Sequence, residues 1–251
     1  MVSLDIVVPV YNEGENIVGV LDALRRSVKR SCRVLICYDR DDDNTLPVVR
    51  AYTGASFEII PVKNRRRGVH GAVATGFQAS TAPAVLVIPA DDTYNAGILD
   101  QMVDRIEEGY DIVAPSRFMK GGRMVGCPWL KAALVRVSAF VLYHVARLPT
   151  HDPTNGFRVF SRRVLDLIPI ESSEGFTYSI ELLVKCHRLG WKVGEVPSQW
   201  YERKKGTSRF KVLQWSPAYL RWVGYAFATT YLLKGPETVR LTDQGASPLA
   251  S

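Results

Sequence analysis

Apolar residues in the N-terminal half of the chain follow two alternating patterns. Leu4–Val10 is a short run of mostly Val and Ile, which is typical of a strand buried in a parallel sheet. Glu13–Lys29 instead places apolar residues three and four positions apart, which predicts an amphipathic helix. The same patterns predict strands at Arg33–Tyr38, Phe57–Val62, Ala84–Pro89 and Asp111–Pro115, and helices at Thr45–Tyr52, Val69–Ser80 and Ile98–Glu108. Such alternation predicts an α/β fold with a mainly parallel sheet flanked by helices.

The C-terminal half contains two long apolar segments that are interrupted by cations. Trp129–Arg147 carries Lys131 and Arg136, and Val212–Leu233 carries Arg221 in its middle. Because a membrane span needs about 20 predominantly apolar residues in a row, neither segment is predicted to cross a membrane. We expect both, at about residues 128–148 and 212–233, to form amphipathic helices that lie on a membrane surface. Shorter elements are expected at Phe157–Phe160, Thr177–Leu189 and Lys192–Pro197.

Length and composition indicate a single folded domain. Of the 251 residues, 47% are hydrophobic and 23% are charged, which is typical of globular proteins and excludes wholesale disorder, collagen-like repeats and coiled coils. Residues 1–234 are expected to form one domain, and the polar, Gly- and Pro-containing residues 235–251 are expected to be a disordered tail.

Net charge and cysteine content limit the partners and the cellular compartments that are expected for the protein. Lys and Arg number 32 against 25 Asp and Glu, so the net charge is +7, which suits an anionic partner or simple solubility equally. The four cysteines form no C-x-x-C pair and have no neighbouring His cluster, so a zinc site is not expected and a reducing compartment fits best. The N-terminus lacks the basic region and cleavage site of a signal peptide.

Polar residues follow almost every predicted strand of the N-terminal half. In open parallel sheets, ligands bind at the carboxyl ends of the strands, so these residues are expected to share one binding edge. They are Tyr11–Glu13, Asp39–Asn44, Lys63–Gly68, Asp91–Asp92 and Ser116–Arg117.

Two acidic clusters at this edge suit a hard cation. Asp91 and Asp92 follow a buried strand, where carboxylates can hold Mg²⁺ or Mn²⁺ against a diphosphate. Helix N-capping explains the same residues, because Asp favours that position. The acidic loop Asp39–Thr45 suits ligand binding and a solvated loop equally.

Two basic clusters suit phosphate groups. Asn64–Gly68 lies at the same edge as the acidic loops, which favours a nucleotide diphosphate with its metal over a nucleic acid. Arg203–Lys211 holds five cations around a Gly-Thr-Ser triplet, which favours a flexible phosphate-gripping loop. For both clusters, the alternative interpretation is a solvated surface loop without a ligand.

Aromatic residues are spaced along one face of the last predicted helix. A Trp and Tyr stripe beside cations suits a membrane interface, although packing of the same helix against the sheet explains it as well. The stripe comprises Trp215, Tyr219, Trp222 and Tyr225.

Taken together, these motifs resemble glycosyltransferase family 2, which has the GT-A fold, and within it the dolichol-phosphate mannosyltransferase and polyprenyl-phosphate glycosyltransferase branch. The resemblance covers about Leu4 to Lys211 and depends on several motifs in order. These are Val8–Glu13 (VPVYNE), Tyr38–Thr45, Gly68–Gly76, Ser116–Arg117, Asp152–Arg158 (DPTNGFR) and Arg203-x-x-Gly206-x-Ser208.

The sequence departs from the family pattern at two points. The Asp-x-Asp motif of the family reads Pro89-Ala90-Asp91 here, so its first carboxylate is absent and Asp92 is the available substitute. The transmembrane helices that many bacterial relatives carry are also missing, so the amphipathic helices are expected to provide the membrane contact.

The resemblance implies an inverting transfer of a mannose- or glucose-type sugar from a nucleotide diphosphate, of the GDP-mannose or UDP-glucose type, to a polyprenyl or dolichyl phosphate. Asp91, Arg117 and Arg203 are the implied catalytic residues, and Mg²⁺ or Mn²⁺ the implied cofactor, held by Asp91 and Asp92. The nucleotide sugar is assigned to Pro9, Tyr11, Glu13, Asp39 and Asp91, and the acceptor phosphate to Arg117, Lys131, Arg203 and Ser208. Such an enzyme is expected on the cytoplasmic face of the membrane, without nucleic acid as a partner.

Two other functions remain open. A family member that glycosylates a sugar hydroxyl needs a carboxylate base, for which Asp152 and Glu181 are the candidates. A non-catalytic nucleotide-sugar or nucleic-acid binding module is the other alternative, motivated by Pro89 and the positive charge.

Overall fold

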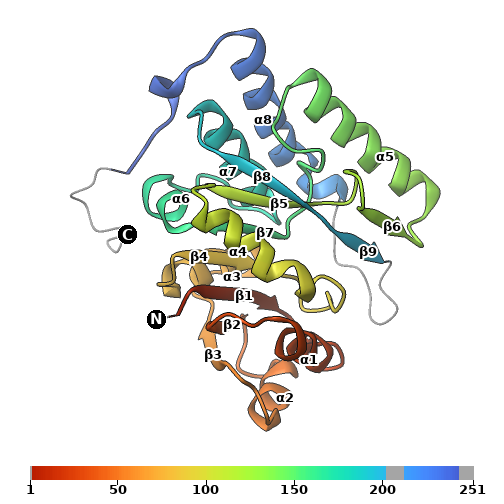
Figure 1. The fold of residues 1–251 in the computed structure, drawn as a ribbon, viewed down its shortest axis with the longest axis vertical. Coiled ribbons are helices and arrows are strands. Elements are labelled where there is room, and N and C mark those ends of the chain that lie inside the picture. Colours follow the sequence, from red (N-terminus) through yellow and green to blue (C-terminus); the bar gives the residue numbers. More distant parts are fainter. Residues whose placement is uncertain (1, 202–211, 243–251) are drawn as a thin grey trace.

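The computed structural model describes residues 2–201 and 212–242, and the side chains from residue 217 onward in the second range. Within these residues, seven strands form a central sheet in the order β3-β2-β1-β4-β7-β5-β8 (Figure 1). Their bounds are β1 Leu4–Val10, β2 Cys32–Tyr38, β3 Glu58–Lys63, β4 Ala84–Val87, β5 Ile112–Ser116, β7 Arg158–Ser161 and β8 Val193–Pro197.

The sheet is mainly parallel, as the sequence predicts. β1 pairs in parallel with β2 and β4, β2 with β3, and β5 with β8, whereas β7 runs antiparallel between β4 and β5. The reversal at β7 joins two parallel groups of strands into one sheet. The carboxyl ends of β1, β2, β4 and β5 therefore open on the same edge.

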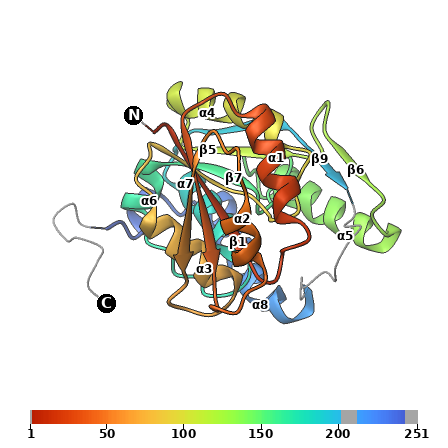
Figure 2. The ribbon, with the colours of Figure 1, turned by 90° about the horizontal axis from the view of Figure 1, so that it is seen from below.

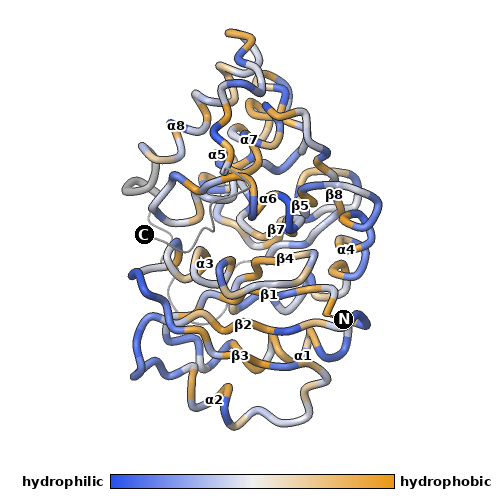
Figure 3. Tube along the Cα trace, turned by 90° about the vertical axis from the view of Figure 1, so that its left-hand side faces the viewer, coloured by the Kyte–Doolittle hydropathy of each residue, from blue (hydrophilic) through white to orange (hydrophobic). Residues whose placement is uncertain are grey.

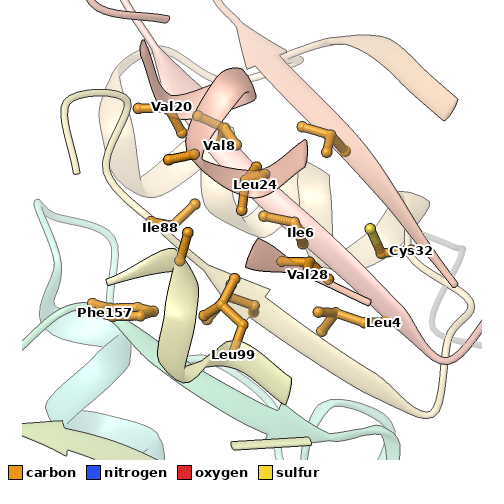
Figure 4. Close-up of a cluster of buried hydrophobic side chains, with 14 of the residues drawn as sticks. Leu4, Ile6, Val8, Val20, Leu24, Val28, Cys32, Ile88, Leu99 and Phe157 are labelled. Atoms are coloured by element: carbon orange, nitrogen blue, oxygen red, sulfur yellow. The ribbon is translucent and has the colours of Figure 1, made fainter. Parts of the chain in front are cut away.

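Helices cover both faces of the sheet because side chains alternate between the faces along each strand. On one face, Leu4, Ile6 and Val8 of β1 belong to a core cluster with residues of three helices, and the close-up shows the part of it that faces α1 and α4 (Figure 4). The helices on this face are α1 Ile17–Ser27, α2 Thr45–Ala51 and α4 Leu99–Glu107. Figure 2 shows α1 and α4 on the same side of the strands.

The opposite face receives α3 Gly68–Ala79, α6 Arg162–Leu167 and α7 Thr177–Arg188. The helix α3 lies close to β1 and β2 because Gly76 has no side chain. A Cβ atom at this position would lie 2.4 Å from Cγ1 of Val7 and 2.9 Å from Sγ of Cys37. Burial raises the pKa of the Cys37 thiol to about 12, so this cysteine stays protonated and acts as a small packing residue.

A third cluster of buried side chains lies at the end of the molecule where α5, α7 and α8 gather (Figure 1). The segment predicted as one long helix is α-helical over α5 Trp129–Phe140 and then π-helical over η2 Val141–Val145. The last helix is α8 Val212–Tyr231, and its Trp222 packs with α7 in this cluster.

Several short elements were not predicted from the sequence. Gln199–Tyr201 (β9) continues from β8 and pairs in parallel with Arg123–Val125 (β6) in a separate two-stranded sheet. Residues 96–98 form a 3₁₀ turn, η1, before α4.

The expected disordered tail is partly ordered. Pro236–Thr238 form a 3₁₀ turn, η3, Val239 is buried, and Thr242 donates its backbone N–H to the carbonyl of Leu167. Residues 243–251 lie outside the described residues, so the expectation of disorder stays a prediction there.

Candidate functional site

The loops that follow β1 and β2 are joined by four hydrogen bonds from backbone N–H groups to side chains, one of which runs from Asn44 to Oδ1 of Asn12 at 3.3 Å. Asn12 donates to Oδ2 of Asp43 at 3.0 Å, and Glu13 donates to Oγ1 of Thr45 at 2.9 Å. Gly14 donates to Oδ1 of Asn44 at 3.0 Å. The acidic loop after β2 is therefore a rigid partner of the β1 loop rather than a solvated turn.

A small polar cavity of about 130 Å³ opens between these two loops. Tyr11 is 42% exposed at its mouth, and Arg40 forms an ion pair with Asp42 beside it at 2.6 Å. The cavity is lined by Tyr11, Asn12, Arg40, Asp42 and Asp43. Glu13 accepts a hydrogen bond from Asn16, and Pro9 is half-buried within β1.

Asp39 follows β2 and is fixed by groups that precede α3. Its Oδ1 accepts a hydrogen bond from Nδ2 of Asn64 at 2.6 Å, and its Oδ2 accepts one from the N–H of Gly68 at 2.8 Å. Asn64 is buried and also accepts hydrogen bonds from Arg66 and Thr75. The sequence places Asn64 in the basic cluster Asn64–Gly68 but does not reveal that its side chain fixes Asp39, because the three arginines that follow it dominate the local pattern.

Asp91 and Asp92 differ in their surroundings although they are adjacent. Oδ1 of Asp92 accepts the N–H groups of Tyr94 and Asn95, both at 3.0 Å, and its Oδ2 accepts Nδ2 of Asn95 at 2.7 Å. Burial raises the pKa of Asp92, and these hydrogen bonds oppose the shift. Asp92 therefore holds the turn before η1 and α4, but it is not their N-cap, since those positions are Asn95 and Ile98. Asp91 lies half-buried at the carboxyl end of β4.

The residues at this edge fit a cation that is shared with a substrate. Among the described residues, no group of three or more His, Cys, Asp or Glu side chains is arranged as a metal cage. Mg²⁺ is usually held by one or two carboxylates together with substrate phosphates and water, so Asp91 meets the requirement for the protein ligand. Asp92 already accepts three hydrogen bonds in its own turn.

Arg117 follows β5 and is held by a buried carboxylate. Its Nε and Nη2 donate to Oδ2 and Oδ1 of Asp152 at 2.6 and 2.7 Å, and its backbone N–H donates to the same Oδ2 at 3.1 Å. Asp152 is fully buried, and the side chain of Arg117 is 12% exposed. A bidentate pair of this kind fixes the plane of the guanidinium group.

The other residues assigned to an acceptor phosphate are only partly described. Nζ of Lys131 on α5 lies 4.9 Å from the ring centroid of Trp200 on β9, so α5 and β9 meet beside the site. Arg203 and Ser208 lie outside the described residues.

The last helix differs from the expected interfacial stripe. Trp222 is 1% exposed in the core between α7 and α8, so its expected position at a membrane surface is wrong. Arg221 forms an ion pair with Glu171 at 2.8 Å, and Tyr219 is half-buried. The side chain of Trp215 lies outside the described residues.

The two candidate bases for a hydroxyl acceptor are both fully buried and engaged. Asp152 binds Arg117, as described above. Glu181 on α7 accepts the N–H groups of Glu171 and Ser172 at 2.7 and 2.8 Å and forms an ion pair with Lys185 at 2.7 Å. Neither carboxylate has the access to substrate that a general base requires.

Helix α5 presents its apolar side chains to the outside. Trp129 is 80% exposed, and the other apolar residues on this surface are Leu130, Leu134, Val137 and Phe140. No helix in the described ranges is both long enough and apolar enough for a transmembrane segment.

Comparisons with solved structures support the fold. Glucosyl-3-phosphoglycerate synthase from Mycobacterium tuberculosis, in complex with Mn²⁺, UDP and glucosyl-3-phosphoglycerate, superposes with a TM-score of 0.66 at 18% identity. The superposition covers 90% of this chain and 80% of that chain.

Comparisons of sequence identify the family. The chain is 26% identical over 227 residues to a polyprenol monophosphomannose synthase from Mycolicibacterium smegmatis, covering 84% of this chain and 85% of the relative. It is 31% identical over 205 residues to a dolichyl-phosphate hexose transferase from Haloferax volcanii, covering 80% and 84%. The model of glycosyl transferase family 2 matches residues 5–168. The sheet order, the strand-end site and these matches agree, and the chain belongs to glycosyl transferase family 2.

Proposed function

We propose that this protein transfers a mannose- or glucose-type sugar, with inversion, from a nucleotide diphosphate to a polyprenyl or dolichyl phosphate. The observation that carries the proposal is the Arg117 guanidinium, fixed by a buried Asp152 at the sheet edge that also bears Asp91. The names of the two sequence relatives support a lipid-phosphate acceptor.

The nucleotide occupies the loops after β1 and β2. Tyr11 at the cavity offers a ring for the base, and Pro9 and Glu13 flank it in sequence. Asp39 lies between this cavity and α3 and supplies carboxylate oxygens for ribose hydroxyls. Hydrogen bonds from Asn64 and Gly68 hold that carboxylate in place before a donor arrives. The donor is of the GDP-mannose or UDP-glucose type.

Asp91 would hold a divalent cation together with the donor diphosphate. When bound there, Mg²⁺ or Mn²⁺ would supply positive charge to the leaving diphosphate. The structural neighbour whose complex contains Mn²⁺ and UDP supports the use of a divalent metal. Asp92 contributes by fixing the turn that follows Asp91 rather than by binding the metal with a free carboxylate.

Arg117 binds the acceptor phosphate together with Lys131, Arg203 and Ser208. The ion pair with Asp152 uses Nε and Nη2, and among the described residues no acceptor is bonded to Nη1, which faces the phosphate in this proposal. A phosphate monoester has a second pKa of about 6, so much of it is dianionic near neutral pH. Such a nucleophile needs no protein base, which agrees with the buried state of Asp152 and Glu181.

The chemical step is a single displacement. A phosphate oxygen of the acceptor forms a bond to the anomeric carbon while the bond from that carbon to the donor diphosphate breaks. The nucleoside diphosphate leaves with the electron pair, and the configuration at the anomeric carbon inverts. The protein aligns the two reactants and stabilises the leaving charge.

Helix α5 meets the membrane in this proposal. Its exposed apolar residues lie beside Lys131 and Arg136, and hydrophobic residues recur along α5 and α8 at the same end of the molecule (Figure 3). The polyprenyl chain stays in the lipid, so the phosphate is met at the bilayer surface. Free thiols at all four cysteines support a location on the cytoplasmic face.

The proposal is tested by transfer from a panel of nucleotide sugars to three acceptors: a short polyprenyl phosphate, 3-phosphoglycerate and a neutral disaccharide. We expect metal-dependent transfer to the polyprenyl phosphate with formation of a phosphodiester-linked sugar of inverted configuration. Arg203→Lys keeps the charge but loses the planar fork, so transfer should fall. Transfer to the disaccharide alone would instead support a hydroxyl acceptor, and binding of donor without any turnover would support a non-catalytic module.

A further inference from the structure

Arg158, the first residue of β7, is a fully buried cation without a carboxylate hydrogen-bonded to it in the described contacts. Its Nη1 donates to the carbonyl of Ser179 at 2.5 Å, and its Nη2 donates to the carbonyls of Pro153 and Asp152 at 2.7 and 3.3 Å. Its Nε is buried and lacks an acceptor among the described residues. Burial of a guanidinium group against carbonyl groups alone costs free energy of folding, so packing alone does not explain an arginine at this position.

The carbonyl groups that Arg158 binds belong to the loop that holds Arg117. The backbone of Asp152 faces Arg158, whereas the carboxylate of the same residue faces Arg117. Asn155 fixes the far end of this loop, because its Nδ2 donates to the carbonyl of Pro115 at 2.9 Å. Arg158 thus supports the loop from the core side, and Arg117 lies on the other side.

The charges in this arrangement favour an anion at Arg117. The net charge of this group is +1, because the two guanidinium groups of Arg117 and Arg158 lie near a single carboxylate, that of Asp152. Burial lowers the pKa of Arg158 to about 10, and the nearby Asp152 opposes the shift, so Arg158 is protonated at neutral pH. The next carboxylate, Glu195, is bonded to Thr150 and His151.

We propose that Arg158 is a positioning residue for the acceptor phosphate: it fixes the backbone of residues 152–153 so that Asp152 presents the guanidinium of Arg117 in one orientation. This inference rests on the proposed function, through the role of Arg117. Arg158 itself does not touch the phosphate, because it is fully buried behind the loop.

Arg188 provides a matched control, because it is also a buried arginine whose described hydrogen bonds go to uncharged oxygen atoms. It is 7% exposed and donates to the carbonyl of Tyr225 and to the hydroxyl groups of Thr229 and Thr238, at 2.8, 2.8 and 3.0 Å. These bonds join α7 to α8 and to the segment after it, and none of them reaches the loop of Asp152. If Arg158 had only a structural role, its substitution and that of Arg188 would have similar effects on stability and on acceptor kinetics.

The test compares the full-length wild type with Arg158→Met, Arg158→Lys and Arg188→Met. For each protein we would measure the melting temperature, the affinity for GDP and UDP with Mg²⁺, the binding of citronellyl phosphate, and kcat and KM for that acceptor. Arg158→Met should lower kcat/KM for the acceptor about a hundred-fold with donor affinity unchanged, since small displacements of aligning groups have effects of this size. Arg158→Lys should restore part of the loss, and Arg188→Met should lower the melting temperature without changing acceptor KM.

Each outcome of this test supports or overturns the inference. Acceptor KM and kcat at wild-type values in Arg158→Lys and Arg158→Met would overturn it while leaving the proposed function intact, and so would an equal loss in Arg188→Met. If Arg158→Met does not fold, Arg158→Lys alone decides, because its charge is kept and only the forked geometry is lost. A wild type that binds citronellyl phosphate but does not transfer sugar contradicts the proposed reaction, and acceptor binding by the variants then decides the inference. A wild type that does not bind it overturns both.

Discussion

The two halves of the molecule build their sites in different ways. In the N-terminal half, from β1 to α4, the polar residues follow adjacent parallel strands and bond to one another across short loops, as Asn12 does with Asp43. In the C-terminal half, from β5 to α8, the key contacts join different kinds of element: Arg117 after β5 bonds to Asp152, and Arg158 of β7 bonds to the backbone of Ser179 in α7.

This difference indicates how each half contributes to the proposed reaction. The strand-end loops of the N-terminal half are fixed by the sheet itself, so they suit a donor site that is formed in advance. The C-terminal half combines one rigid ion pair with a helix, α5, whose apolar surface is exposed. It suits an acceptor that arrives from a lipid surface.

The largest expected effect separates the two adjacent aspartates of the N-terminal half. Asp91→Asn should lower kcat about a hundred-fold or more, because Asp91 is the proposed ligand of the metal ion that would stabilise the leaving diphosphate. Asp92→Asn is the matched control and should mainly lower the melting temperature, because Asp92 holds the turn before α4. Steady-state transfer assays with added Mg²⁺ or EDTA, together with thermal unfolding, would check both variants. Normal turnover by Asp91→Asn would remove Asp91 from the metal site.

In the C-terminal half, the ion pair of Asp152 should dominate both stability and acceptor use. Asp152→Asn leaves the guanidinium of Arg117 without its charge partner, and breaking a buried pair typically costs about 3–5 kcal/mol in the free energy of unfolding. Asp166→Asn breaks an exposed pair with Arg162 and should change stability little. Urea unfolding measures the two losses, and equal values would contradict the assigned importance of the buried pair.

The N-terminal half also contains a buried carboxylate away from the site, and it predicts a pH dependence of stability. Burial alone would raise the pKa of Asp5, but hydrogen bonds from Arg33 and from the N–H groups of Thr81 and Ala82 lower it below the ordinary value. A depressed folded-state pKa adds stability above the unfolded pKa of about 3.9, and this stability is lost as the pH falls through the folded value.

Asp5→Asn should therefore lower the free energy of unfolding at neutral pH by about 1.5–3 kcal/mol, the usual contribution of hydrogen bonds to a charged group. It should also flatten the fall in stability below about pH 4. Urea unfolding across this pH range, with the wild type in parallel, checks the sign. If the stability of the variant falls below about pH 4 as steeply as that of the wild type, the fall comes from other carboxylates.

The smallest effect on stability is expected on the surface of α5. Leu134→Ser should change the free energy of unfolding by less than about 0.5 kcal/mol, because Leu134 is exposed. It should nevertheless weaken sedimentation with anionic liposomes, whereas Val18→Ser, an exposed apolar residue of α1, should not. Charge reversal at Lys131 should weaken the same binding, and high salt should release the protein. Equal binding by all these proteins would exclude α5 as the contact with lipid.

The sequence by itself determined the N-terminal half and the positions of its polar residues. Strand and helix patterns from Leu4 to Ser116 agree with the structure within a few residues, because strands buried on both faces and their covering helices carry distinct apolar periods. The placement of Tyr11, Asp39, Asp91 and Arg117 at strand ends followed from the parallel topology alone.

Only the tertiary structure showed which partners the charged side chains bind and which aromatic rings are buried. The sequence could not distinguish Asp91 from Asp92, because only the fold shows that Asp92 accepts three hydrogen bonds in its own turn. It placed Trp222 at a membrane surface, whereas the packing of α8 on α7 buries that ring, since an aromatic stripe has the same spacing in both situations. The role of Arg158 could not be predicted from the sequence. The carbonyl groups that bind it belong to a loop and to α7, which only folding brings together.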